Sequence, residues 1–287
     1  MIHTVQHMLK IGREGTNQDI DYPDTNIDVE INRLDMAQDD IYRELLRLHP
    51  TLLANYYDLS LTGLAEYALP FMAPARYCKI LLVIDVTASD SFFNTVPTYW
   101  SDRMQYHENN IPVERVAWNI RDKKVETPNK DSAITLRFWY ARKPVGFLYG
   151  DVGSGSTSTT IVFPTTPSAP SSDVPMPEDD YYNGMLVECN GEVFPITDYV
   201  HSTKTATIDG TWLTTPLNTH TMSLVSPLPE QYHSLIADGY KRYHKVDNDD
   251  DDSILLRAMQ GKEDKLNSEF GVENSQINKQ VKRIPHF

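Results

Sequence analysis

The segment NIDVEINRLDMAQDDIYRELLRLHP (residues 26–50) carries the strongest structural signal in the chain, a regular spacing of branched apolar residues. These residues recur at steps of three, four or seven, with charged residues between them: Ile27, Ile31, Leu34, Ile41, Leu45 and Leu48. The spacing predicts an amphipathic helix of about six turns with one buried face. We expect Asp24 or Thr25 to cap its start. His49-Pro50 should end or kink it, because a proline disfavours helical backbone in the residue before it.

The residues before this helix show no clear period, so we predict an irregular arm over residues 1–23. His3 and His7 stand four residues apart, and this spacing would place both on one face of a helix. Two histidines at a frayed chain end are weak evidence for a metal site, and we expect none there.

After residue 50 the pattern changes to short stretches rich in aromatic and β-branched residues, separated by Gly or Pro, which predict strands. Examples are NYYDLSL, KILLVIDV, AITLRFWYA, GMLVEC and EVFPITDYV. CNGE (residues 189–192) places Asn-Gly between two of them, the strongest short signal for a hairpin. IDGTW (residues 208–212) offers a second turn, and residues 98–110 predict a short helix.

Residues 150–180 have the composition of a loop, since nineteen of these 31 residues are Gly, Ser, Thr or Pro. We expect an exposed excursion here, because a long loop of this kind is usually functional or disordered. TTIVF (residues 159–163) within it is a candidate edge strand.

The last third of the chain is helical again, with LPEQYHSLIADGYKRYHKV and SILLRAMQGKEDKLNSEFGV as two predicted helices. Helices at both ends, with strands between them, predict an α+β fold. In it a helical bundle forms from the N- and C-terminal helices, with a large antiparallel β-rich region, sandwich- or barrel-like, inserted between them. The expected parts are an arm and long helix (1–50), the inserted region with its exposed loop 150–180 (51–228), the C-terminal helices (229–270) and an extended tail (271–287).

Composition narrows the class of protein. The formal net charge is −14, so a general basic surface for nucleic acid is not expected. The longest aliphatic run, ILLVI (residues 80–84), is too short to span a bilayer, and the start lacks the apolar core of a secretion signal. Cys78 and Cys189 have neither a zinc nor a disulfide-framework spacing, which predicts two buried thiols in a protein made in a cytoplasm.

Motifs for catalysis or cofactor binding are missing from the sequence. GDVGSGSTSTT (residues 150–160) is rich in glycine, but it has neither the Gly-Lys-Ser/Thr of a phosphate loop nor a Gly-x-Ser-x-Gly nucleophile elbow. We therefore expect no enzymatic activity and no cofactor, although a hydrolase with a dispersed site stays open as an alternative.

The run KVDNDDDDS (residues 245–253) concentrates five acidic side chains: Asp247, Asp249, Asp250, Asp251 and Asp252. As a calcium loop of the EF-hand type it fails, because Asp252 stands where the turn glycine is needed and Ala258 where the bidentate acid is needed. The remaining interpretations are a solvated loop between two helices and an acidic wall that faces a channel.

The order of these segments resembles that of the head–tail adaptor (connector) proteins of tailed bacteriophages. The similarity starts with the helix at NIDVEINRLDMAQDDIYRELLRLHPTLL, followed by NYYDLSLTGLAEYALP and the strand KILLVIDV. EDDYYNGMLVECNGEVFPITDYVHSTKTATIDGTWLTTPLNTHTMSLVSPLPEQYHSLI resembles a β-module that is common in phage structural proteins. Its recurrent features are an aromatic before Gly, an Ile-x-x-Tyr strand and a strand leading to Trp and Pro: Tyr182, Gly184, Ile196, Tyr199, Trp212 and Pro216.

This resemblance implies a structural protein of the virion, made in the host cytoplasm and located at the head–tail interface. Such adaptors form a ring, usually of twelve copies, beneath the portal protein. The ring extends the channel through which packaged DNA passes without sequence-specific binding, and it docks tail, nozzle or tail-fibre proteins. No membrane is involved.

The C-terminal tail of such adaptors commonly grips the portal. The tail NKQVKRIPHF suits that role, because it is mildly basic and ends in an aromatic residue. The resemblance thereby implies portal-binding residues: Lys279, Lys282, Arg283, Ile284, Pro285, His286 and Phe287. The acidic run would face the channel, where it repels phosphate, or the open solvent. The alternative function is a tail-associated or tail-spike-type glycan-binding protein, suggested by the sixteen Tyr and four Trp.

Overall fold

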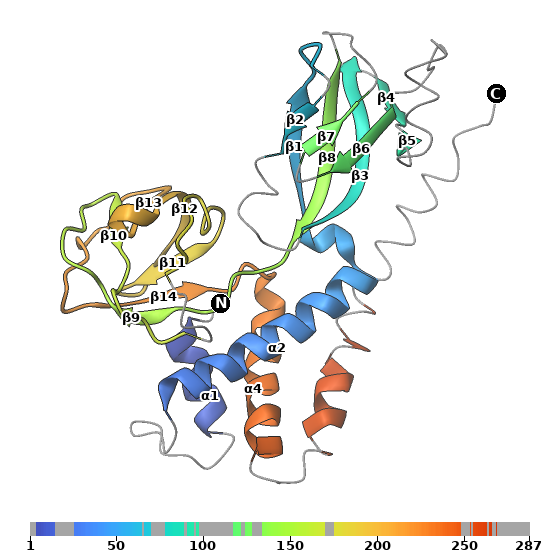
Figure 1. Ribbon diagram of the computed structural model, residues 1–287. Helices are drawn as coiled ribbons and strands as arrows, with labels where there is room; N and C mark the ends of the chain where they lie inside the picture. The colour runs from blue at the N-terminus through green and yellow to red at the C-terminus, as the bar shows by residue number, and fades with distance from the viewer. Residues whose placement is uncertain are drawn as a thin grey trace. The chain divides into compact units, whose positions relative to one another are not determined.

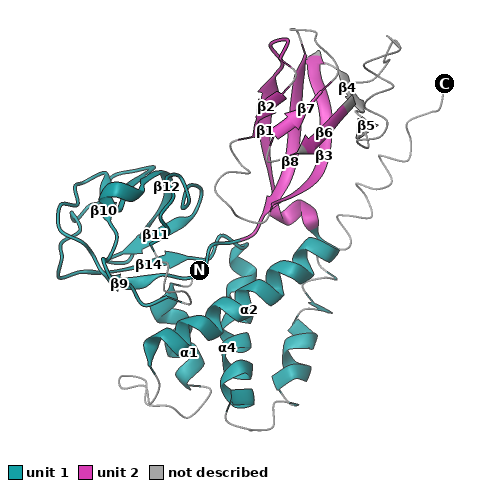
Figure 2. Ribbon diagram, viewed as in Figure 1, with its two compact units in different colours: residues 1–49, 144–287 teal, residues 50–143 magenta. Residues whose placement is uncertain are grey.

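The fold combines helices with sheets that are antiparallel apart from one parallel strand pair (Figure 1). A computed structural model describes residues 4–14, 26–64, 66–69, 78–88, 91–94, 96–97, 117–121, 124–127, 134–169, 175–247, 253, 255–262, 264–265 and 268. The chain divides into two compact units (Figure 2). Unit 1 comprises residues 1–49 and 144–287, and unit 2 comprises residues 50–143.

The helices of unit 1 come from both ends of the chain. They are α1 (Val5–Glu14), α2 (Ile27–Leu48) and α4 (His233–Asp247), the last preceded by the 3-10 turn η4 (Glu230–Tyr232). Both α1 and α2 contact α4. The long helix at residues 27–48 is confirmed, and His49 ends it as predicted. Its start differs, because Asn26 is the cap and its side chain accepts a hydrogen bond from the Asp28 amide at 3.0 Å.

The prediction of an irregular arm over residues 1–23 is wrong for α1. Val5, Met8, Leu9 and Gly12 lie buried on one face of this helix, at the spacing of an amphipathic stripe. The stripe is short and contains a glycine, which hides it in the sequence. Glycine is needed at position 12, because a Cβ there would overlap the ring of Tyr240 in α4.

The sheet of unit 1 has six strands in the order β10-β13-β12-β11-β14-β9. The strands are β9 (Tyr149–Asp151), β10 (Thr160–Val162), β11 (Leu186–Cys189), β12 (Glu192–Val200), β13 (Thr205–Ile208) and β14 (Thr221–Val225), with the 3-10 turn η3 (His201–Thr203) between β12 and β13. The predicted hairpin is confirmed: Asn190 and Gly191 join β11 to β12 with φ of 55° and 81°. Two positive φ angles mark a type I′ turn, which fits the twist of the flanking strands.

Residues 150–180 belong partly to this sheet. TTIVF supplies the edge strand β10, as predicted, and it pairs with β13. Val152, Ile161 and Phe163 are buried, so the segment is not exposed throughout. Serine, threonine and proline dominate its composition, but these three apolar residues decide where it packs.

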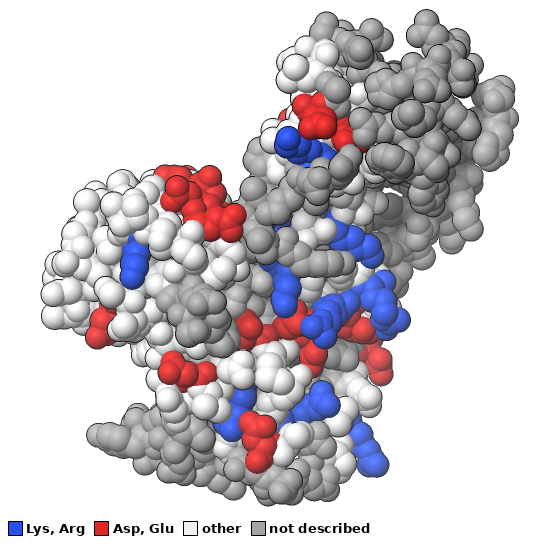
Figure 3. All heavy atoms as spheres, viewed as in Figure 1, with Lys and Arg blue, Asp and Glu red and all other residues white. Residues whose placement is uncertain are grey.

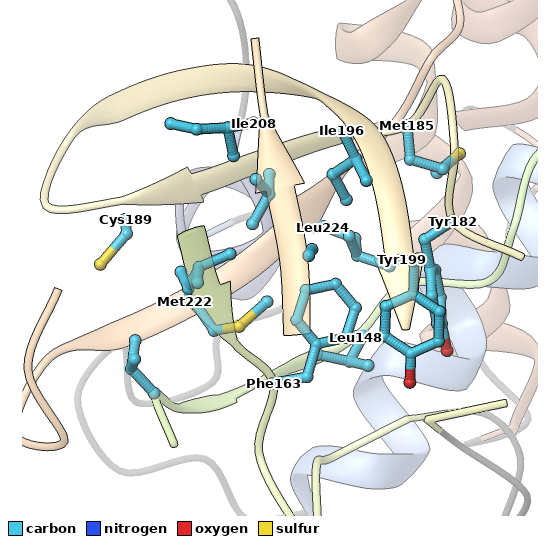
Figure 4. Packing of buried hydrophobic residues seen from close by; sticks show 14 of the residues in the cluster. Leu148, Phe163, Tyr182, Met185, Cys189, Ile196, Tyr199, Ile208, Met222 and Leu224 are labelled. Carbon is cyan, nitrogen blue, oxygen red and sulfur yellow. The ribbon is translucent and has the colours of Figure 1, made fainter. Parts of the chain in front are cut away.

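One hydrophobic core fills the six-stranded sheet region, which we call the β module (residues 144–228). Figure 4 shows side chains from several strands of the sheet and from the segments before them pointing into it, among them Leu148, Phe163, Tyr182, Ile196, Tyr199 and Leu224. All of these side chains are less than about 2% exposed. Phe163, Tyr182 and Tyr199 pack as neighbouring rings, with centroids 4.8 to 5.3 Å apart.

Unit 2 contains two four-stranded sheets and the 3-10 turn η1 (Pro50–Leu53). The first sheet has the order β1-β8-β3-β4, formed by β1 (Ala54–Ser60), β8 (Thr135–Arg142), β3 (Cys78–Ala88) and β4 (Ser91–Asn94). The second has the order β2-β7-β6-β5, formed by β2 (Glu66–Ala68), β7 (Lys124–Glu126), β6 (Ala117–Arg121) and β5 (Val96–Pro97). Leu59, Tyr67, Val125 and Phe138 meet in its core.

The predicted β-rich segment 51–228 therefore contains the strands of both units, and the boundary between the units falls inside it, after residue 143. The helix expected at residues 98–110 lies outside the described residues.

Candidate functional site

The acidic run begins inside the helical part of unit 1. Asp247 is the last residue of α4, and its carboxylate accepts a hydrogen bond from Nε of Arg33 at 2.8 Å. Arg33 lies in α2 and is buried, whereas the Asp247 side chain is half exposed. The first acid of the run thus helps to join α4 to α2. Asp249, Asp250, Asp251 and Asp252 lie outside the described residues, as does the whole predicted portal-binding tail from Lys279 to Phe287.

A fully buried carboxylate links all three helices. Glu30 of α2 accepts two hydrogen bonds from Arg13 of α1, at 3.1 and 2.6 Å, and one from the Tyr240 hydroxyl of α4 at 3.0 Å. The bond to Glu30 raises the pKa of Arg13, and burial together with the neighbouring Glu30 raises the pKa of Tyr240. A buried charge held by an opposite charge and a hydroxyl tolerates little change in helix positions.

Further polar contacts hold α4 on its other sides. The Tyr243 hydroxyl donates to Asp40 of α2 at 2.5 Å, and burial together with this bond raises the pKa of Tyr243 to about 12. Asp238 of α4 accepts hydrogen bonds from Lys241 and Lys262. Lys262 belongs to the helical residues 255–262, so the Asp238 contact fastens that segment to α4.

The residues that carry the phage-module pattern converge on the core of the β module. Tyr182, Ile196, Tyr199 and Trp212 are each at most 3% exposed, and Gly184 takes a φ of 78° that favours glycine. The Tyr182 hydroxyl accepts a hydrogen bond from the Met176 amide at 3.0 Å. These positions therefore hold the module together as core residues.

A loop of the β module presents two apolar side chains to solvent. This loop, here called the Leu loop, spans residues 209–220 between β13 and β14, and it exposes 92% of Leu213 and 54% of Leu217. The Glu192 carboxylate accepts hydrogen bonds from the amides of Leu213 and Thr214, at 2.9 and 3.4 Å. The Leu217 amide donates to Nδ1 of His220 at 3.2 Å. The backbone on which the leucines stand is thus fixed.

The outer face of one unit 2 sheet is apolar across three strands. Tyr56 of β1 and Leu82 of β3 both pair with Trp139 of β8, so the three side chains share one face. Tyr56 is 56% and Leu82 50% exposed. The opposite face of the same sheet already supplies core residues such as Phe138 and Leu136. This sheet therefore has apolar residues on both faces, which is unusual unless something covers the second one.

A hollow lies beside this apolar row. It has a volume of about 490 Å³ and a mostly apolar lining, formed by Pro50, Thr51, Ala54, Leu81, Leu82 and Trp139. Arg137 borders the row on the same face, where it stacks 4.4 Å above the Tyr56 ring and binds the Asp58 carboxylate through two hydrogen bonds of 2.7 Å. The hydrogen bonds from Arg137 lower the pKa of Asp58. An apolar floor with few polar groups suits apolar side chains of a protein partner.

Charge is distributed unevenly over the chain. The β module has nine Asp or Glu and a single Lys, a formal net charge of −8, whereas unit 2 has eleven Lys or Arg and ten Asp or Glu, a net charge of +1. Figure 3 shows acidic side chains gathered at one corner of the β-sheet part of unit 1. Within the module, burial and the nearby Asp180 and Asp179 raise the pKa of Asp198, which indicates mutual repulsion.

Signs of a metal or membrane site are lacking in the described residues. No three His, Cys, Asp or Glu side chains there are placed to hold a metal ion, and no described helix is long and apolar enough to cross a bilayer. Neither cysteine forms a disulfide; Cys189 is buried and Cys78 half-buried, and burial raises the pKa of the Cys189 thiol to about 11. His7 lies exposed on α1, and His3 lies outside the described residues.

The two exposed apolar surfaces escaped the sequence analysis, although one carries a signal. Phe138 and Trp139 are adjacent in a strand, so they must point to opposite faces, and both faces then need cover. The Leu loop has no such signal, because nothing in its sequence tells which leucine is exposed. No protein-family model matches the chain, and no curated protein matches it either.

Proposed function

We propose that this chain is a structural head–tail adaptor of a tailed bacteriophage. In this role, copies of the chain form a ring beneath the portal protein, extend the DNA channel and dock tail, nozzle or tail-fibre proteins. The proposal includes the finer description of the fold, a helical bundle made of N- and C-terminal helices with a β-rich region inserted between them.

The main observation in support of the proposal is that α2, from the first part of the chain, packs against α4, from its last part. Ala37 of α2 lies against Gly239 of α4, so closely that a Cβ on the glycine would overlap it. Glu30 and Tyr240 join the same two helices by a buried hydrogen bond. Nearly all of the chain between α2 and α4 that the structure describes forms strands, turns and loops. This order of elements supports the resemblance to phage adaptors.

The β module supports the proposal independently. Tyr182, Ile196, Tyr199 and Trp212 were selected by their order in the sequence, and all four belong to a single buried cluster. A shared core explains why these residue types recur together in a module. The exposed apolar loop and the apolar sheet face add surfaces of the kind that a subunit of an assembly needs.

Portal binding by the tail is tested by deletion. We expect the full chain to co-purify with the portal protein encoded in the same genome, and a variant that lacks residues 271–287 to lose this binding. Circular dichroism and the thermal midpoint of the deletion variant should equal those of the full chain. Retained portal binding by the deletion variant would remove the tail from the proposal.

A glycan-binding tail protein is the second candidate, favoured by an aromatic pair of unit 2, the exposed Tyr56 and the half-buried Trp139. Tyr56 and Trp139 lie with ring centroids 5.3 Å apart, and the charged pair of Asp58 and Arg137 stands beside them. Such a platform can stack on a sugar ring. A glycan array probed with the purified chain separates the two functions: the adaptor proposal predicts no selective binding, and specific binding lost in Trp139→Ala would favour the second candidate.

A further inference from the structure

The Leu loop and the hollow of unit 2 are two apolar surfaces of opposite shape on one chain. One projects two leucines from a fixed backbone, and the other is a depression with an apolar lining. Both surfaces are exposed in the described residues. Removal of their apolar area from water would be favourable in free energy.

The backbone around the two leucines is fixed by hydrogen bonds and by ring packing. The Trp212 amide donates to the Ser158 carbonyl at 2.8 Å, and the Trp212 ring packs edge-on against Phe194 with centroids 4.9 Å apart. Glu192 holds the next two amides, and His220 holds that of Leu217. A loop that is already fixed loses little conformational entropy on binding, so its exposed apolar side chains bind more strongly than those of a free segment.

The net charges of the β module and of unit 2 favour a contact between the Leu loop and unit 2. Two β modules repel each other, because each has a net charge of −8. Unit 2 has a net charge of +1, and the exposed Lys79 lies on the same sheet face as the apolar row, as does Arg137, which is paired with Asp58. Glu192 and the exposed Asp209 accompany the leucines. The acidic loop of one copy therefore complements the hollow of another copy.

We propose that the Leu loop of one copy inserts Leu213 and Leu217 into the hollow of unit 2 in a second copy. The two surfaces differ, so the contact is head-to-tail, and repetition of such a contact gives a ring when the rotation closes. This inference rests on the proposed function, since an adaptor needs a closed ring. The Leu loop and the hollow are the surfaces that would build that ring.

Cross-linking of paired cysteines tests the insertion. All variants carry Cys78→Ala, and the buried Cys189 stays in place. One variant adds Leu213→Cys, a second adds Leu82→Cys, and a third adds both. A short bismaleimide is applied to each variant and to an equal mixture of the first two, both alone and bound to the portal protein.

The insertion predicts a covalent dimer in the mixture and a ladder of larger species in the double variant, but no cross-link in either single variant alone. A dimer of the Leu213→Cys variant alone would overturn it, because that product needs a two-fold contact. Portal-bound particles with many copies and no cross-link would overturn the insertion and leave the adaptor proposal standing. Cross-links without portal binding would support the insertion and contradict the adaptor function.

A matched substitution measures how much the leucine contributes. Leu213→Ser should reduce self-association at least tenfold, and Leu213→Met should restore it, because methionine keeps an apolar side chain. Val246→Ser is the control, since Val246 is 51% exposed on α4 and lies outside both surfaces. Equal loss in Leu213→Ser and Val246→Ser would overturn the insertion. Circular dichroism should be unchanged in all three variants.

Discussion

The two large β regions of this chain use their aromatic residues in opposite ways. The β module buries Phe163, Tyr182 and Tyr199 in one core and surrounds it with acidic side chains. The β1-β8-β3 face of unit 2 leaves Tyr56 exposed and Trp139 half-buried beside an apolar hollow. A high content of tyrosine and tryptophan therefore has two meanings here. In the module these residues form the core, and in unit 2 they contribute to an apolar face for which we propose a partner.

The largest expected effect separates a buried from an exposed aromatic residue. Tyr199→Ala should lower the free energy of unfolding by about 3–5 kcal/mol, because it leaves a cavity in the module core. Tyr56→Ala should lower it by no more than about 1 kcal/mol, from the lost contact with Arg137. Urea unfolding followed by circular dichroism measures both. Similar losses for the two variants would contradict the division of roles between the two regions.

The tyrosine hydroxyls refine this comparison within the module. Among the described residues the buried Tyr199 hydroxyl has no hydrogen-bond partner, and burial raises the pKa of Tyr199 to about 12. Tyr199→Phe should therefore leave the free energy of unfolding unchanged or raise it slightly. Tyr182→Phe removes the acceptor of the Met176 amide and should cost about 1 kcal/mol. A larger loss from Tyr199→Phe would reveal an additional polar partner.

The helical layer offers a contrast between a buried and an exposed ion pair. Glu30→Gln should cost about 2–3 kcal/mol, because Arg13 loses a fully buried charged acceptor. Glu44→Gln breaks the exposed pair with Arg47 and should cost at most about 0.5 kcal/mol. The difference in the midpoint of urea unfolding checks both values. A small effect at Glu30 would mean that the three helices are held by apolar packing alone.

Replacement of a glycine by alanine should change stability less, and the change should be a loss in the sheet and a gain in the helix. Gly191→Ala at the β11–β12 turn should cost about 1–2 kcal/mol, because φ is 81° there. Gly261→Ala in the helical residues 255–262 should stabilise by up to about 1 kcal/mol, since nothing lies within 4 Å of the added Cβ. Thermal unfolding of the two variants checks the opposite signs. A loss at both positions would contradict the helical conformation of residue 261.

Burial and acid repulsion at Asp198 give the smallest effect, and its size depends on pH. The pKa of Asp198 is raised in the folded protein, so the folded state binds more protons than the unfolded state between the ordinary and the raised pKa. Stability falls as pH rises through this window. Asp198→Asn should therefore stabilise the protein at neutral pH by no more than about 0.5 kcal/mol, as is usual at the surface. This gain should become smaller as the pH falls towards 4 and vanish below about pH 3, where aspartate is protonated in both states.

Urea midpoints at pH 4 and pH 7 measure this difference. A gain for Asp198→Asn that is the same at both pH values would exclude repulsion as its cause.

The elements that sequence predicts well are those with a strong local period or a specific turn. The α2 helix, its end at His49, the Asn190-Gly191 hairpin and the edge strand β10 all have such signals. The helix α1 was missed because its stripe has four positions, one of them a glycine chosen for contact with Tyr240. That contact depends on tertiary packing, which no window of sequence contains.

The candidate surfaces were harder to predict than the fold. Asp247 was assigned to a solvated or channel-facing loop, whereas its carboxylate pairs with Arg33 across two helices, a contact 214 residues apart in sequence. Leu213 and Leu82 look like ordinary core residues in the sequence, because exposure is decided by the packing of distant segments. Tyr182, Tyr199 and Trp212, which carry the resemblance to a phage module, all lie in the core of the β module, so their pattern reports on packing.

The central claim, that the chain is a ring-forming adaptor, is tested most directly by native mass spectrometry. The purified chain of 32.8 kDa is measured alone and after it is mixed with the portal protein encoded in the same genome. We predict a complex in which many copies of the chain bind each portal ring. A chain whose mass stays the same in the presence of the portal would contradict the claim and shift the interpretation to a tail-associated, glycan-binding protein.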